Sequence, residues 1–171
     1  MQMQQSHKPP RWLYADADMS NSKRDLSARQ VQAWARLLGV QRLALQVVER
    51  ALAGARLPPL AWYDVLLELD RAGKPGLRPF ELHERMLLAQ YNLSRLLDRL
   101  GKRGYVERRE CMQDGRGLVV AISEAGRAVR RQMWPVYAVA IKASFADHLS
   151  ARDVALLDSI LGTLNERLRA M

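Results

Sequence analysis

Hydrophobic residues recur at helical spacing over much of the chain, and prolines and glycines divide this pattern into segments. The spacing predicts a long first helix over about 27–54, a second over about 60–72 and a short third over about 79–86. Pro58 and Pro59 separate the first two, because proline cannot continue the hydrogen-bond ladder of a helix. The first half of the chain is therefore expected to be helical from residue 27 onward.

The most amphipathic segment covers residues 89–103. Gly104 follows it directly and suits the left-handed conformation that ends many helices. We therefore predict a fourth helix over about 89–103. Its leucines occupy positions i, i+3, i+4 and i+7 and so share one face, which holds the helix to the protein; they are Leu93, Leu96, Leu97 and Leu100.

The pattern then changes to that of β-strands. Residues 105–109 and 118–122 contain strand-forming side chains, and Asp114-Gly115 lies between the two runs. Asp-Gly between two such runs is a hairpin signal. The sequence therefore predicts a small hairpin with a basic first strand.

Helical spacing returns after the hairpin. Ser123 is a suitable N-cap for a fifth helix over about 124–148, in which Pro135 is expected to cause a kink. Ser150 and Asp153 resemble a capping box at the start of a sixth helix. This last helix is expected to extend nearly to the end of the chain.

The pattern divides the chain into two regions. Residues 1–26 are rich in Gln, Ser, Lys and Pro and are expected to form a flexible tail. Residues 27–171 are expected to form one domain, mainly α with a small β-hairpin. In this domain, a central lobe at about 57–123 is flanked by long helices at about 27–54 and 124–170.

The charge balance is strongly basic, with 27 Lys and Arg against 18 Asp and Glu and a formal net charge of +9. Such a surplus favours a polyanionic partner such as nucleic acid, although solubility alone is an alternative explanation. The single cysteine, Cys111, excludes an intramolecular disulfide and fits a reducing compartment. No secretory signal or transmembrane helix is expected, so the predicted location is the cytoplasm.

Two short helices followed by a basic hairpin are typical of a winged helix-turn-helix. In that fold one helix enters the major groove of DNA, and the hairpin, or wing, reaches the backbone or the minor groove. Gln and Asn bond adenine edges, Arg reads guanine, and Ser or Tyr binds phosphates. For the fourth helix alone, a solvated face is the alternative, but the adjoining wing favours DNA contact. The candidate DNA contacts, of which the first three lead for base readout, are Gln90, Tyr91, Asn92, Ser94, Arg95, Arg99, Lys102 and, on the first strand, Arg108.

Residues 77–126 contain five motifs in order: Pro79-Phe80-Glu81-Leu82, Asp98-Arg99-Leu100, Arg103-Gly104-Tyr105-Val106-Glu107-Arg108, Asp114-Gly115-Arg116 and Ser123-Glu124-Ala125-Gly126. With these motifs in this order, the segment resembles the MarR family of bacterial regulators. The family's pattern is Pro-x-Glu-Leu, then Asp-Arg-Leu near the end of the recognition helix, Arg-Gly-(aromatic or Leu)-Val-Glu-Arg, Asp-x-Arg in the wing, and (Thr or Ser)-Glu-x-Gly after it. The helices on either side extend the resemblance over about residues 27–169.

The resemblance implies a homodimer whose first and last helices interlock, with one recognition helix and one wing in each subunit. It implies a transcriptional regulator, more often a repressor than an activator, that binds an inverted repeat. It also implies that Arg116 enters the minor groove, which attracts arginine, and that Asp114 orients its guanidinium. Ordinary turn chemistry is an alternative role for Asp114.

One departure from the family concerns the turn before the recognition helix. The family usually has Gly-Leu-Ser there, whereas this chain has Leu87-Leu88-Ala89. Alanine cannot cap a helix, and losing a cap costs about 1 kcal/mol. The identity of the base-reading residues therefore stays open.

The resemblance further implies a small effector, because many relatives bind phenolic or other aromatic anions beside the dimer-forming helices. Aromatic walls with a few polar groups suit such a pocket. Core packing is nevertheless the favoured alternative for each candidate. The candidate lining residues are Trp34, Arg36, Trp62, Tyr63 and His83.

Other functions have weaker support in the sequence. Cys111, near two arginines, is a candidate redox sensor, although an incidental cysteine is the favoured alternative. His83-Glu84 begins like a zinc-protease motif, but Leu87 stands where the second histidine is required. We therefore expect no enzyme, no metal site and no cofactor. A helical scaffold that binds another protein, with a merely solvated basic face, is the remaining alternative.

Overall fold

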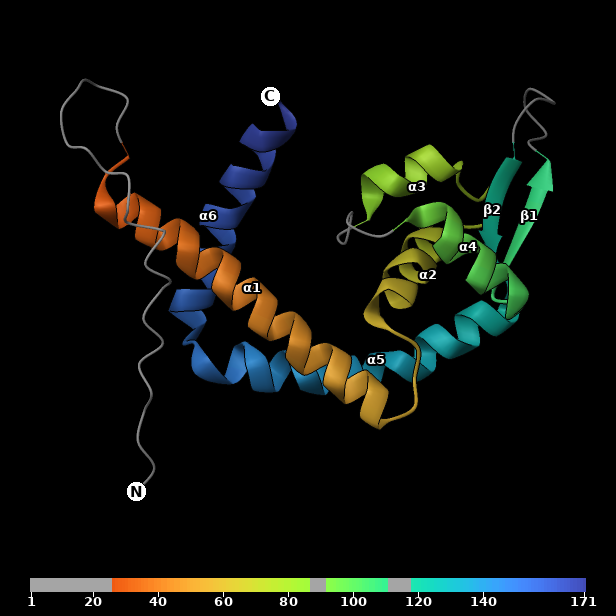
Figure 1. The fold of residues 1–171 in the computed structure, drawn as a ribbon, viewed down its shortest axis with the longest axis horizontal. Coiled ribbons are helices and arrows are strands. Elements are labelled where there is room, and N and C mark those ends of the chain that lie inside the picture. Colours follow the sequence, from red (N-terminus) through yellow and green to blue (C-terminus); the bar gives the residue numbers. More distant parts are fainter. Residues whose placement is uncertain (1–25, 87–91, 111–117) are drawn as a thin grey trace. The chain divides into compact units, whose positions relative to one another are not determined.

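The order of elements in the computed structural model follows the sequence pattern, mainly α with one small antiparallel hairpin (Figure 1). The structure describes residues 26–86, 92–110 and 118–171, and residues 1–25, 87–91 and 111–117 lie outside this description. The elements are α1 (Ala28–Gly54), α2 (Leu60–Ala72), α3 (Pro79–Arg85), α4 (Leu93–Lys102), β1 (Val106–Glu110), β2 (Leu118–Ile122), α5 (Glu124–Ser144), the 3₁₀ turn η2 (Ala146–His148) and α6 (Ala151–Arg169).

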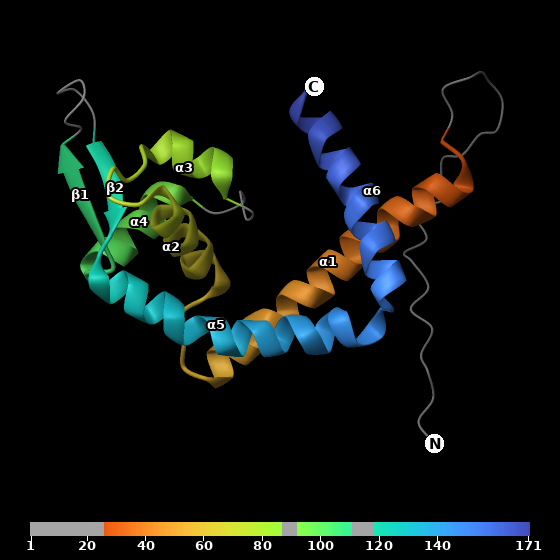
Figure 2. The same cartoon turned by 180° about the vertical axis from the view of Figure 1, so that it is seen from behind.

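The chain divides into two compact units, residues 1–43 and 44–171, and α1 passes from the first into the second. In the first unit, the described part of α1 exposes large apolar side chains, including Trp34 and Val40. In the second unit, α2, α3, α4 and the two strands group into a lobe at the start of α5, as both views show (Figures 1 and 2).

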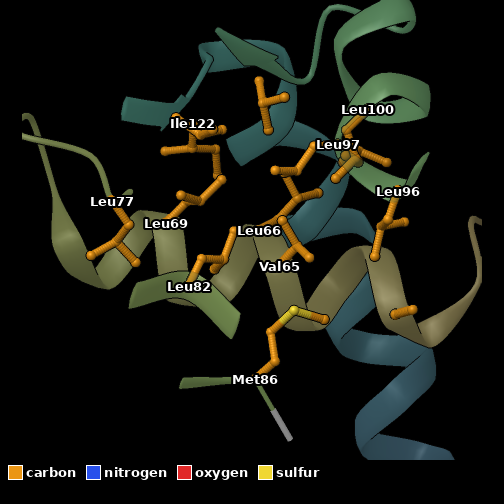
Figure 3. Close-up of a cluster of buried hydrophobic side chains, with 14 residues drawn as sticks. Val65, Leu66, Leu69, Leu77, Leu82, Met86, Leu96, Leu97, Leu100 and Ile122 are labelled. Carbon is orange, nitrogen blue, oxygen red and sulfur yellow. The ribbon is translucent and has the colours of Figure 1, made fainter. Parts of the chain in front are cut away.

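A core of buried apolar side chains holds this lobe together (Figure 3). Leu66, Leu82 and Leu100 are fully buried in it and come from α2, α3 and α4 respectively. Burying a leucine contributes about 1.5–3 kcal/mol, so these contacts fix the three helices against one another. This lobe core consists of Ala61, Val65, Leu66, Leu69, Leu77, Leu82, Met86, Leu96, Leu97, Leu100, Val106, Val120, Ile122 and Val129.

Ion pairs also tie α2 to α5. Asp70 on α2 accepts a hydrogen bond from Arg127 Nε at 2.9 Å, and its second carboxylate oxygen lies 2.7 Å from Arg130 Nη2. All three side chains are less than one third exposed, since their exposed fractions are 25%, 31% and 22%. A partly buried carboxylate shared by two guanidiniums is screened less by solvent than a surface pair, so this network joins the lobe to α5.

The two strands of the hairpin pair in a single register, and a third segment, at Leu77, bonds to β2. β1 and β2 pair antiparallel from Val106 opposite Ile122 to Glu110 opposite Leu118. Leu77, before α3, adds two backbone hydrogen bonds to Val120 at 2.9 and 2.8 Å. β2 is thus paired with β1 on one edge and with the segment before α3 on the other.

Close packing where the wing meets α5 explains the Ser-Glu-Ala-Gly sequence. Ser123 caps α5 by accepting a hydrogen bond from Gly126 N at 3.0 Å, and its hydroxyl donates to Gly104 O at 2.6 Å. A Cβ on Gly126 would lie 2.1 Å from Tyr105 O, so only glycine fits without movement. Gly104 adopts φ 69°, the left-handed conformation predicted for the end of the fourth helix.

The last third of the chain differs from the prediction in one boundary. α5 continues through Pro135 but ends at Ser144, not at residue 148, and η2 follows it. The predicted capping box at the start of α6 is confirmed, because Ser150 and Asp153 exchange hydrogen bonds. The hydrogen bond from the Ser150 hydroxyl lowers the pKa of the Asp153 carboxyl.

Candidate nucleic-acid interface

The fourth helix separates its side chains into two faces, as predicted. Leu96, Leu97 and Leu100 are buried in the lobe core, and Leu93 packs against it. The cations Arg95, Arg99 and Lys102 are exposed on other positions of the helix. Their spacing of i, i+4 and i+7 places them on one side of α4, and we call these three residues the α4 cation stripe.

Where the predicted DNA contacts fall within the described residues, they are exposed. Besides the α4 cation stripe, these are Asn92 and Ser94 at the start of α4 and Arg108 on β1. Gln90, Tyr91, Asp114 and Arg116, as well as Cys111, lie outside the described residues. The described part of the lobe thus presents a polar, cationic surface at α4 and β1.

The predicted start of the fourth helix at Ala89 is wrong. Asn92 has an extended backbone conformation, and α4 begins at Leu93. The Oδ1 atom of Asn92 accepts a hydrogen bond from Arg95 N at 3.1 Å, so Asn92 is the N-cap that was expected to be missing. A bidentate contact to adenine uses this same oxygen, so capping competes with base readout at this residue.

Replacing Asn92 by alanine is expected to lower the free energy of unfolding by about 1 kcal/mol, because the first turn of α4 loses its cap. Asn92→Ser retains a capping oxygen and is expected to stay within a few tenths of a kcal/mol of the parent protein. Chemical denaturation measures both. Equal stabilities of the alanine and serine variants would show that the cap contributes nothing.

Arg108 and Arg109 point to opposite faces of the hairpin, because successive side chains alternate along a strand. Arg108 Nη2 lies 2.5 Å from Asp98 Oδ1 on α4. Arg109 pairs within its own strand with Glu107, through Nε at 3.2 Å and Nη2 at 2.6 Å. The two arginines therefore have different roles, and the sequence alone assigned none to Asp98.

The structure places two of the candidate effector-lining residues, Trp62 and Tyr63, in different clusters of the second unit. Trp62 packs against the lobe core and contacts Tyr105 edge-on, with ring centroids 5.9 Å apart. Tyr63 instead packs with Tyr137, at 5.2 Å, in a separate buried cluster formed by the end of α1, α2 and α5. Trp62 and Tyr63 therefore do not share one pocket, because adjacent residues of a helix point about 100° apart. Of the other three, Trp34 and Arg36 are exposed in the first unit and His83 is exposed on α3.

Two surface hollows in the second unit have other linings. One, of about 430 Å³, lies between the wing, the turn after α2 and α5, and is lined by Gly73, Lys74, Arg109, Ala121, Ile122 and Arg127. The other, of about 520 Å³, is apolar and is lined by Val47, Ala51, Pro135, Val136, Val139, Ala140 and Ala143. In the cluster that contains Tyr63, burial raises the pKa of the Tyr137 hydroxyl, as Tyr63 and Asp64 also do, so this tyrosine is protonated at neutral pH.

The described residues contain neither a metal-binding cluster nor a helix suited to cross a membrane. No group of three or more His, Cys, Asp or Glu side chains in residues 26–86, 92–110 and 118–171 is arranged to hold a metal ion. Over the same residues, no helix has both the length and the apolar character needed to cross a membrane. The exposed face of α4 and the adjoining wing strand therefore remain the leading candidate site in the described chain.

Sequence comparison gives two matches to this arrangement. The model of the MarR family matches residues 57–117, which run from just before α2 to the residue before β2. The HTH-type transcriptional repressor YetL of Bacillus subtilis (strain 168) is 26% identical over 144 residues, which cover 84% of this chain and 85% of YetL.

Structural comparison agrees with these matches. Sco3205, a MarR family transcriptional regulator from Streptomyces coelicolor solved in complex with DNA, superposes with a TM-score of 0.75 at 26% identity, covering 87% of this chain and 93% of that one. AbsC, a MarR family transcriptional regulator from the same organism, superposes with a TM-score of 0.71 at 27% identity, covering 87% of this chain and 100% of that one. In motifs, topology and extent alike, the chain is therefore similar to the MarR family of winged helix-turn-helix transcriptional regulators, whose model matches its residues 57–117.

Proposed function

We propose that the protein is a homodimeric transcriptional repressor that binds an inverted repeat in double-stranded DNA. The observation that carries this proposal is the division of α4 into a buried leucine face and the exposed α4 cation stripe. Two relatives support it, because Sco3205 was solved with DNA and YetL is a repressor.

The chemistry of α4 suits a helix that lies in the major groove. Arginine bonds guanine in bidentate fashion, and lysine neutralises phosphates as a point charge. Arg95 is in the first turn of α4, which lies nearest the bases in a helix-turn-helix, whereas Lys102 is at the opposite end. We therefore assign base contact to Arg95 and phosphate contact to Lys102, with Arg99 between them.

The exposed apolar residues of α6 support a dimer. No residue of Ala151–Arg169 is buried, yet Leu156, Ile160, Leu164 and Leu168 recur every four residues along it and are 61%, 49%, 45% and 67% exposed. An apolar stripe of this length is costly to leave in water and marks an interaction surface. A second copy related by a two-fold axis presents the same stripe, which makes the surface self-complementary.

Duplex binding is expected to be saturable and strongly dependent on salt. If several phosphates are contacted, affinity for an inverted-repeat duplex should fall on the order of a thousandfold between about 50 and 200 mM salt, because each contact releases condensed counterions. Fluorescence anisotropy with DNA captured by the purified protein measures this slope. A protein-binding scaffold would show no saturable duplex binding at any salt concentration.

Sedimentation of the free protein and of its DNA complex completes this test. We expect a dimer in solution and two chains per inverted repeat, with half-sites about one helical turn apart. A monomer that binds a single half-site with full affinity would contradict the dimeric part of the proposal while leaving DNA binding intact.

A further inference from the structure

One ion pair joins the recognition helix to the wing. Asp98 is the single acidic residue of Leu93–Lys102, and its Oδ1 atom lies 2.5 Å from Arg108 Nη2 on β1. Both side chains are about half exposed, at 53% for Asp98 and 51% for Arg108. The pair thus lies at the surface, on the helix that carries the α4 cation stripe.

Stability alone is a weak reason for this arrangement. Ion pairs between solvent-exposed side chains contribute little to folding, because solvent screens them and two long side chains lose freedom. The lobe core already fixes α4, through Leu96, Leu97 and Leu100. A carboxylate on a surface that meets DNA also repels phosphates. Asp98 is therefore expected to have a role other than stabilising the fold.

The geometry of β1 shows how Asp98 acts on Arg108. Residues two apart on a strand share a face, so Arg108 projects from the same face as Val106, which is buried in the lobe core. That face is turned towards the helices, and Asp98 meets the guanidinium there. A guanidinium carries five N–H donors in one rigid plane, so the bond at Nη2 orients the plane and leaves further donors for an anion.

We propose that Asp98 is a positioning residue for DNA binding, which holds the Arg108 guanidinium at the junction of α4 and the wing to receive a backbone phosphate. The inference rests on the proposed function. With α4 in the major groove and the wing beside it, the sugar-phosphate backbone between the two grooves passes over this junction. An arginine fixed in advance binds that phosphate without losing its side-chain freedom on association.

The substitution Asp98→Ala separates positioning from simple charge repulsion, because the two effects have opposite signs. Alanine is the best helix former, so α4 is expected to remain folded. If Asp98 acted only as a negative charge, its removal would strengthen DNA binding. If it positions Arg108, affinity for the duplex should fall about five- to tenfold, and the salt slope should decrease by close to one phosphate contact, as for Arg108→Ala.

A double-mutant cycle tests the coupling directly. The double variant Asp98→Ala with Arg108→Ala is expected to bind DNA no more weakly than Arg108→Ala alone. Once Arg108 is absent, its phosphate contact is already lost, and removing Asp98 cannot weaken that contact further. Asp98→Glu is expected to recover part of the affinity by retaining the carboxylate. Glu107→Ala is the matched control, because it removes an acid that pairs with Arg109 within the same strand and joins no helix to the wing. Its affinity is expected to be unchanged or higher.

The measurements are duplex anisotropy over a range of salt concentrations and thermal unfolding of each variant. Unchanged unfolding temperatures with the losses stated above support the proposal. Equal or tighter binding by Asp98→Ala, or losses from the two single substitutions that add, would overturn it. If Asp98→Ala does not fold, the similarly sized Asp98→Asn variant replaces it. Weaker DNA binding by that variant supports positioning, and tighter binding indicates charge repulsion alone. Failure of the parent protein to bind any duplex would instead overturn the proposed function.

Discussion

Replacing Arg95, Arg99 and Lys102 together by alanine is expected to weaken duplex binding on the order of a thousandfold. Each cation of the α4 cation stripe is exposed and lies on the side of α4 away from the lobe core. Losing one such contact costs about 1–3 kcal/mol, and about 1.4 kcal/mol is tenfold in affinity. The salt slope should decrease by about 1 for each phosphate contact that is lost, Lys102 among them, when it is measured by anisotropy on the operator duplex.

A matched control removes the same charge elsewhere in the second unit. Arg71 on α2 and Arg131 and Lys142 on α5 are also exposed, and each is paired with a nearby acid. Their triple alanine variant is expected to lose less than about tenfold, because only the long-range field of the protein changes. Equal losses in the two triple variants would mean that overall charge, and not α4, determines binding.

The substitution Gly126→Ala is expected to lower the free energy of unfolding by about 3 kcal/mol, the upper part of the usual range for overpacking. The new Cβ would lie 2.1 Å from Tyr105 O and 2.9 Å from Ile122 Cγ1, and the first of these is a backbone atom that the wing holds in place. In a chain of this size, the melting temperature should fall by about 6–12 °C. Calorimetry or denaturant unfolding checks the value.

The same substitution at Gly101 serves as the control. Gly101 lies within α4, and a Cβ there meets nothing within 4 Å. Gly101→Ala is therefore expected to raise stability by about 0.4–1 kcal/mol, because the unfolded chain loses freedom. If Gly126→Ala proved as stable as the parent protein, the junction between the wing and α5 would have to be looser than the structure describes.

Features governed by neighbouring residues were predictable from the sequence. The leucine face of α4, the capping box of Ser150 and Asp153, and the left-handed Gly104 all depend on residues a few positions apart, and the structure confirms each. The predicted start of α4 is wrong because the family's pattern puts the cap at the position of Ala89, whereas Asn92 supplies a capping oxygen three residues later.

Features that depend on tertiary contact were not predictable. Asp70 and Arg127 are 57 residues apart, and no local pattern indicates that they pair. The Asp98–Arg108 pair spans the turn between α4 and β1, where the sequence shows both charges but not their approach. The candidate effector residues Trp62 and Tyr63 were grouped by type, yet neighbours on one helix face different clusters.

The alternation along β1 limits how this protein can diverge. Val106 is directed into the lobe core, Arg108 meets Asp98, and Arg109 lies on the other face. Deleting Glu107 while Val106 stays in the core would turn Arg108 to the other face and bring Arg109 to Asp98. Substitutions in β1 keep this alternation, whereas insertions or deletions there disrupt it. New DNA preferences must therefore arise by substitution at fixed positions.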